Sequence, residues 1–106
     1  MFYEYSSLLD KRWLKNCKVS NVNNFSKMFF HCSSLKDINS LQNWNVSNGE
    51  DFSYMFESCK LVLGLEAFQN WNAIKGDCYH MFKYSYNESK ILKAIQNWKV
   101  YKGDMF

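Results

Sequence analysis

Proline is absent from the 106-residue sequence, and glycine occurs only four times. Disordered and linker-like chains are rich in these two residues, so the composition excludes a chain of that kind. No apolar run approaches the roughly 18 residues that a membrane-spanning helix needs. Residues 1–16 lack the basic start and the continuous apolar segment of a secretory signal, so the sequence predicts no signal peptide.

The sequence also lacks a strong excess of either positive or negative charge. The chain has 13 basic and 10 acidic residues, which gives a net charge of +3, and the two signs are interspersed. A nucleic-acid-binding domain normally concentrates its basic residues in a stripe, so the charge pattern argues against that class. Hydrophobic residues make up 47% and aromatic residues 19%, which is enough for the core of one small domain.

What the sequence does contain is an internal repeat. The tripeptide Gln-Asn-Trp ends at Trp44, Trp71 and Trp98, which are 27 residues apart, and the pair Met-Phe recurs with nearly the same period. The whole chain is therefore predicted to be a single repeat domain of about four units that belongs to a longer array. The predicted units span about 1–27, 28–54, 55–80 and 81–106.

Each unit is predicted to contain one helix and one short strand. Phe25, Met28, Phe29 and Cys32 have the spacing of one helix face, and this spacing recurs in the later units. The segment around Gln-Asn-Trp is less periodic and is interpreted as a strand between two turns. The predicted helices are centred on residues 23–32, 49–58 and 77–85.

The predicted fold class is therefore an α/β solenoid of about four leucine-rich-repeat-like units, each a short strand plus one short helix. The period of 27 lies within the roughly 20–29 residues of leucine-rich repeats. Residues 89–98 would also suit a helix, so an all-α helical-hairpin solenoid stays open as the alternative.

Equivalent positions of stacked units form ladders that run through the domain. Tryptophan rings on successive rungs can stack, and a buried asparagine can bridge backbone groups left unpaired at a turn, whereas the glutamines are expected to face outward. The predicted structural ladders comprise Trp44, Trp71 and Trp98; Asn16, Asn43, Asn70 and Asn97; Met28, Met55 and Met81; Phe29, Phe56 and Phe82; and Cys32 and Cys59.

The cysteines and histidines give no catalytic or metal-binding pattern. Cys32 and Cys59 share a rung position that would permit a disulfide, but buried thiols are favoured because Tyr5 and Ser85 occupy the same position. The pairs around His31 and His80 match no known spacing of metal ligands. We therefore expect a protein that is not an enzyme and that needs no cofactor or metal.

The repeat resembles that of the BspA-like leucine-rich-repeat surface proteins. The segments "LQNWNVSN", "DFSYMF" and "CSSL", together with Cys59 followed by "KLVLGL", carry the resemblance over nearly the whole chain. The resemblance implies a non-catalytic solenoid for protein–protein interaction, adhesin-like or displayed on a surface, and secreted or attached to the cell.

Four tyrosines are predicted to contact a protein partner, since tyrosine is enriched at interfaces: Tyr3, Tyr54, Tyr84 and Tyr101. The alternative function is a repeat-based module that binds RNA or another nucleic acid through stacked aromatic rings and lysines. Against it, lysine recurs at no single position of the repeat. The C-terminal end is expected to leave Trp98 bare and to mediate self-association.

Overall fold

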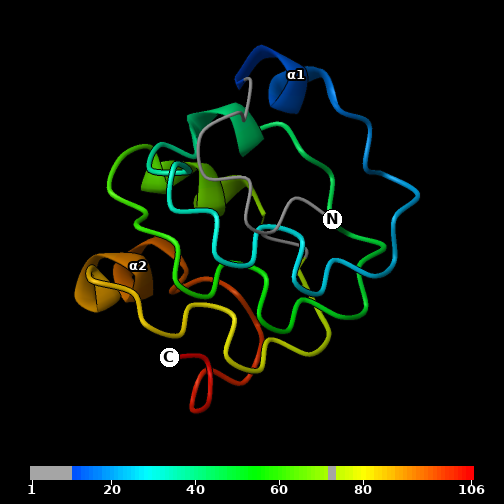
Figure 1. Cartoon of the computed structure of the whole chain (residues 1–106). Helices are drawn as coiled ribbons and strands as arrows, with labels where there is room; N and C mark the ends of the chain where they lie inside the picture. Colours follow the sequence, from blue (N-terminus) through cyan, green and yellow to red (C-terminus); the bar gives the residue numbers. More distant parts are fainter. Residues whose placement is uncertain (1–10, 72–73) are drawn as a thin grey trace.

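Short helices form one side of the protein. The computed structural model describes residues 11–71 and 74–106. It contains α1 (Lys11–Asn16), the 3-10 helices η1 (Asn39–Leu41) and η2 (Leu65–Asn70), and α2 (Glu88–Ala94). Each helix ends shortly before the Trp position of its repeat, and each lies beside the helix of the next copy (Figure 1). The segment predicted as a strand therefore contains a short helix instead.

The opposite side of each copy is a run of tight turns, here called the turn rows, at residues 24–32, 51–59 and 77–85. Backbone N–H groups alternate between two kinds of partner. The N–H of Phe29 donates to the C=O of Met55 in the next copy at 2.9 Å, whereas the N–H of Met28 donates within its own row to the C=O of Phe25 at 3.2 Å. These two kinds of hydrogen bond satisfy the backbone groups of the turn rows, although the rows form neither a helix nor a regular strand.

Residues in the left-handed conformation occur at every fourth position of the turn rows. They are Lys27, His31, Tyr54, Ser58, His80 and Tyr84, with φ between 52° and 63°. A right-handed helix cannot contain such residues, so the predicted helices at 23–32, 49–58 and 77–85 are wrong. The buried positions still have helix-like spacing, because a run of turns also returns to the core every three or four residues.

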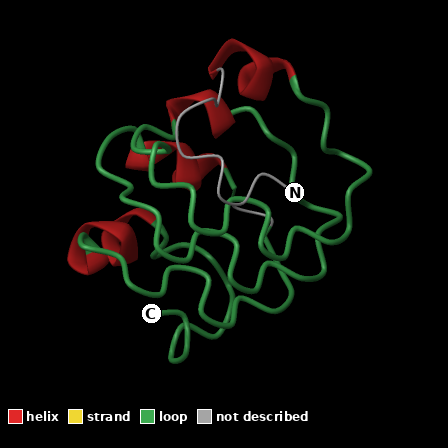
Figure 2. Cartoon of the chain, viewed as in Figure 1, coloured by secondary structure: helices red, strands yellow, loops and turns green. Residues whose placement is uncertain are grey.

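The predicted α/β fold class is also wrong. No strand occurs within residues 11–71 and 74–106, where only the isolated parallel bridges Asn24–Asp51, Asp37–Leu63 and Asp51–Asp77 are found (Figure 2). The protein is therefore not a solenoid of leucine-rich-repeat-like units. The all-α helical-hairpin alternative is not observed either, since each helix spans seven residues or fewer.

The molecule is compact, with a radius of gyration of 12.2 Å and principal dimensions of 32 × 30 × 21 Å. A solenoid of stacked units would be elongated. Hydrogen-bonded neighbouring segments lie only about 4.8 Å apart, so that four copies add little length compared with the width of one copy. Four copies of this period therefore build a globule.

Aromatic columns fill the interior between the helices and the turn rows. The rings of Trp44 and Trp71 are parallel with centroids 6.5 Å apart, and those of Trp71 and Trp98 follow at 6.2 Å. A phenylalanine column runs beside them, with Phe29 stacked on Phe56 at 5.4 Å. The three tryptophans and all the methionines and phenylalanines of the predicted ladders are buried.

The asparagine positions differ from the expectation of buried bridges. Asn16, Asn43, Asn70 and Asn97 are all exposed. Asn70 does join two copies, because its Nδ2 donates to the C=O of Gln42 at 3.2 Å. Stronger links of this kind come from residues outside the ladder: Asn48 donates to the C=O of Ser20, and Asn87 to the C=O of Leu61, both at 2.7 Å.

The last residues cover the end of the tryptophan column. Trp98 is only 2% exposed and Met105 is fully buried, so the expectation of a bare Trp98 is wrong. The Nζ of Lys102 donates to the C=O of Trp98 at 2.7 Å. The half-buried Phe106 stacks on Phe82 with ring centroids 5.6 Å apart.

Candidate binding surface

The left-handed residues of the turn rows lie side by side on the surface. The N–H of Lys27 donates to Ser53 and that of Tyr54 to Tyr79, each at 3.0 Å, which places equivalent positions of neighbouring rows next to one another. None of the six left-handed residues is buried, whereas the adjacent Met and Phe positions are. The turn rows therefore direct one set of side chains inward and another toward the solvent.

Five of the outward-facing side chains form one cluster, here called the aromatic patch: Lys27, Phe30, Tyr54, Tyr79 and His80. The Tyr54 ring meets Phe30, Tyr79 and His80 edge to face, with centroids 6.5, 5.6 and 5.5 Å apart. The Lys27 Nζ lies 5.6 Å from the centroids of both the Phe30 and the Tyr54 rings. Cation–π contacts of this length attract a lysine to an aromatic face.

A carboxylate or amide at the start of each turn row fixes the first turn below the patch. The Oδ1 of Asn24, Asp51 and Asp77 accepts a hydrogen bond from the backbone N–H two residues later, at 2.9 Å in every copy. Such side-chain turns are typical of Asn and Asp. The rigid start of each row positions Tyr79 and the left-handed residue that follows.

A second group of exposed tyrosines lies at the end of the third turn row and just beyond it. Tyr84 is 69% and Tyr86 is 75% exposed. The Nζ of Lys83 lies 5.1 Å from the Tyr84 ring, and that of Lys60 lies 5.6 Å from the Tyr86 ring. These two tyrosines line an open hollow of about 470 Å³ with Ser58, Lys60 and Ser85.

The four tyrosines predicted to bind a partner do not form one site. Tyr54 is at the centre of the aromatic patch, Tyr84 is in the second group, and Tyr101 is a separate residue that is 76% exposed. Tyr3 lies outside the described residues. The prediction missed Lys27, Phe30, Tyr79 and His80. Their register relative to the repeated Met-Phe pair could have identified them.

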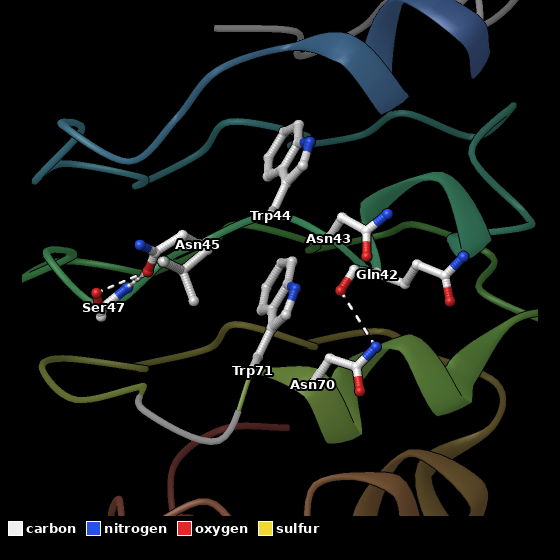
Figure 3. A pocket seen from close by; sticks show the side chains of 8 residues that line it. Gln42, Asn43, Trp44, Asn45, Ser47, Asn70 and Trp71 are labelled. Carbon is white, nitrogen blue, oxygen red and sulfur yellow. Dashed lines mark hydrogen bonds between the residues drawn. The ribbon is translucent and has the colours of Figure 1, made fainter.

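A smaller hollow lies at the edge of the tryptophan column (Figure 3). It has a volume of about 260 Å³ and is lined by Gln42, Asn43, Trp44, Asn45, Val46, Ser47, Asn70 and Trp71. Asn45 accepts hydrogen bonds from the N–H and the hydroxyl of Ser47, at 3.1 and 2.6 Å. Much of the polar lining is therefore engaged in holding the turns, and it offers no acid or base for catalysis.

Three of the four thiols, those of Cys32, Cys59 and Cys78, are buried structural groups. All four cysteines are thiols, and the Sγ of Cys59 donates to the C=O of Phe29 at 2.9 Å. Burial raises the pKa of Cys59, and burial together with the nearby Asp77 raises the pKa of Cys78 to about 12. Within the described part of the chain, no three His, Cys, Asp or Glu residues are grouped to hold a metal.

A comparison with protein families identifies the class of the chain. The model of a family described as "Mycoplasma protein of unknown function, DUF285" matches residues 1–98. The chain therefore belongs to the DUF285 family. No curated protein and no solved structure matches it. Among the described residues, no helix has the length and apolar character needed to cross a membrane.

Proposed function

We propose that the protein is a non-catalytic module that binds a protein partner through the aromatic patch. The observation that carries the proposal is the contrast between the two sides of the turn rows. The buried positions repeat, as in Met28, Met55 and Met81, whereas the neighbouring outward position changes from Lys27 to Tyr54 to His80. A constant frame that displays different exposed side chains suits recognition of a partner better than it suits catalysis.

The similarity of the repeat to BspA-like surface proteins supports a display role on the cell surface. The motif around Trp44, Met55 and Cys59 carries this similarity, and the match to a Mycoplasma family is compatible with it. We extend the proposal accordingly: the chain is an adhesin-like, surface-displayed fragment whose partner is a protein of another cell. The proposal does not need a leucine-rich-repeat fold, because the turn rows supply the exposed surface.

A second candidate is binding of single-stranded RNA. It is favoured by the lysines that lie over aromatic rings, Lys27 over Tyr54 and Lys83 over Tyr84. Bases stack on exposed aromatic rings while lysines contact the phosphates. In the aromatic patch, Tyr54 meets Phe30 and Tyr79 edge to face, and the Tyr79 ring is stacked on His80 with centroids 3.8 Å apart. These contacts leave little open ring face for a base, which makes the protein partner the better choice.

A photo-crosslinking experiment tests both candidates. The photoreactive residue p-benzoylphenylalanine replaces Tyr79, which is 38% exposed in the aromatic patch. A matched variant carries it at Asn16, which is exposed on α1 outside the patch. Each variant is irradiated with surface proteins from candidate target cells and, separately, with total RNA.

The proposed function predicts one discrete, protease-sensitive adduct from position 79 and none from position 16. A nuclease-sensitive adduct that disappears as ionic strength rises would identify RNA as the partner and replace the proposal. Adducts of equal yield at both positions, or no adduct at position 79, would contradict a role for the aromatic patch. Thermal melts of both variants establish that the substitutions leave the fold intact.

A further inference from the structure

The segment Leu61–Leu65 is paired with a neighbouring copy on one side only. The N–H groups of Val62 and Leu63 both donate to the C=O of Lys36, at 2.8 and 2.9 Å, and the N–H of Ile38 donates to the C=O of Leu63 at 3.1 Å. In the following copy the chain turns into α2 at Glu88. The extended segment that would have completed the pairing is therefore replaced by a helix.

Two backbone groups of this segment are left without partners. The C=O of Val62 and the N–H of Gly64 take no part in the bonds to Lys36 and Ile38. Neither group makes a hydrogen bond to any residue within 11–71 or 74–106. Across the gap, Asn87 donates a hydrogen bond to the C=O of Leu61. A peptide backbone laid along this edge would satisfy both groups.

The same edge exposes apolar side chains beside a basic rim. Val62 is 50% and Leu63 is 61% exposed. They line a hollow of about 440 Å³, here called the α2 groove, whose other residues are Gly64, Leu65, Glu66, Gln69, Lys90, Lys93 and Ala94. Lys90 and Lys93 are three positions apart on α2 and therefore occupy one face of the helix. With two lysines and one glutamate, Glu66, the rim carries a net positive charge.

We propose that the α2 groove binds an extended segment of a partner protein in which an aliphatic residue is flanked by acidic residues. The aliphatic side chain covers Val62 and Leu63, the carboxylates face Lys90 and Lys93, and the partner backbone pairs with Val62 and Gly64. Addition of an extended segment to an exposed edge is a general mode of peptide recognition. The α2 groove shares no residue with the aromatic patch, so this proposal does not rest on the function proposed above.

The test uses two capped synthetic peptides, one alternating aspartate with leucine and the other alternating lysine with leucine. Each is titrated into the isotope-labelled protein, and backbone amide shifts are followed by NMR. We expect saturable binding of the acidic peptide, with shifts concentrated at Gly64 and residues 90–94. The lysine peptide is expected to bind at least about tenfold more weakly, because its charges oppose those of the rim.

Two variants test the separate parts of the site. Leu63→Ser is expected to weaken binding of the acidic peptide about tenfold, whereas Leu92→Ser, which removes an exposed leucine of α2 outside the groove lining, leaves it unchanged. The double change Lys90→Glu and Lys93→Glu is expected to reverse the preference between the peptides. All of these side chains are exposed, so the fold tolerates the changes.

Several results would overturn the proposal. Absence of saturable shifts with the acidic peptide, equal affinity for both peptides, or shifts centred on the aromatic patch would each exclude the α2 groove as the binding site for such a segment. Concentration-dependent shifts at Gly64 without any peptide would show that a second copy of the chain occupies the groove.

Discussion

Each buried tryptophan makes two kinds of contact between copies. Trp71 is 1% exposed and stacks between Trp44 and Trp98. Its Nε1–H donates to the C=O of Leu41 at 3.0 Å, and the other two tryptophans make the same bond to Leu14 and Phe68. The ring thus supplies apolar packing, and its one polar atom donates to a helix carbonyl of the preceding copy that also accepts the backbone N–H three residues later.

The first prediction concerns Trp71. Trp71→Ala is expected to lower the free energy of unfolding by about 3–5 kcal/mol, as deletion of a large buried aromatic ring usually does. The control is Gln69→Ala, two residues away and exposed on η2, which is expected to cost less than about 0.5 kcal/mol. Denaturant unfolding measures both values. Equal losses would contradict the assignment of inward and outward positions.

Thiol reactivity is predicted to follow burial. The raised pKa values of Cys59 and Cys78 keep these groups protonated at pH 8, and only the thiolate reacts with alkylating reagents. Cys17 is half-buried and is expected to react first. Mass spectrometry after brief treatment with iodoacetamide should find modification at Cys17 alone, with Cys59 and Cys78 modified once denaturant is present. Modification of Cys59 in the native protein would mean that the core opens readily.

At the scale of the element, the turn rows owe their shape to left-handed residues that are not glycine. This conformation costs roughly 1–2 kcal/mol for an ordinary residue, and glycine adopts it without that strain. The cost is offset by the hydrogen bonds that each row makes to the next copy. The N–H of Ser58, for example, donates to the C=O of Lys83 at 2.9 Å.

Substitution by glycine tests this account of the turn rows. Ser58→Gly, at φ 61°, is expected to raise the free energy of unfolding by up to about 1 kcal/mol, because relief of strain exceeds the entropy cost of glycine. Ser33→Gly is the matched control at a residue without positive φ, and it is expected to cost about 0.5–1 kcal/mol. If both changes destabilise equally, the left-handed geometry of the row is wrong.

The sequence predicted the buried tryptophan, methionine and phenylalanine positions, but it was wrong about the exposed asparagines and about the elements that form the fold. The period placed Trp71 over Trp44 and Phe56 over Phe29, because equivalent positions of a repeat meet when its copies are paired. It did not distinguish a helix from a run of turns, since both bury positions such as Phe25, Met28 and Phe29. The difference lies in the backbone, where left-handed residues other than glycine leave little trace in composition.

Only part of the candidate site could be predicted from the sequence. Tyr54 was selected as an exposed tyrosine, but Phe30 and Tyr79 joined it only once the register of neighbouring turn rows was known. The α2 groove was not predicted at all. It arises because the fourth unit forms α2 where the third has the segment around Leu63. An argument from the similarity of the copies cannot predict a difference between them.

At the scale of the whole molecule, Phe106 is less covered than the phenylalanines at the equivalent positions of the earlier copies. The N–H groups of Phe29, Phe56 and Phe82 each donate to the following copy. The N–H of Phe106 makes no such bond to the described residues, and its ring, stacked on Phe82, is half-buried where Phe82 is fully buried. The half-buried Val100 packs against the same core. The surface around Phe106 has the form of the contact that joins copies within the chain.

Self-association through this surface is therefore the last prediction. A second molecule that covers the Phe106 ring would remove apolar area from water and pair the free N–H. Sedimentation velocity over a wide range of protein concentration is expected to show a rising average mass. Phe106→Ser should abolish the rise, whereas Leu92→Ser, which removes an exposed apolar side chain from α2, should not. A mass that stays monomeric at every concentration would show that the Phe106 surface is inert.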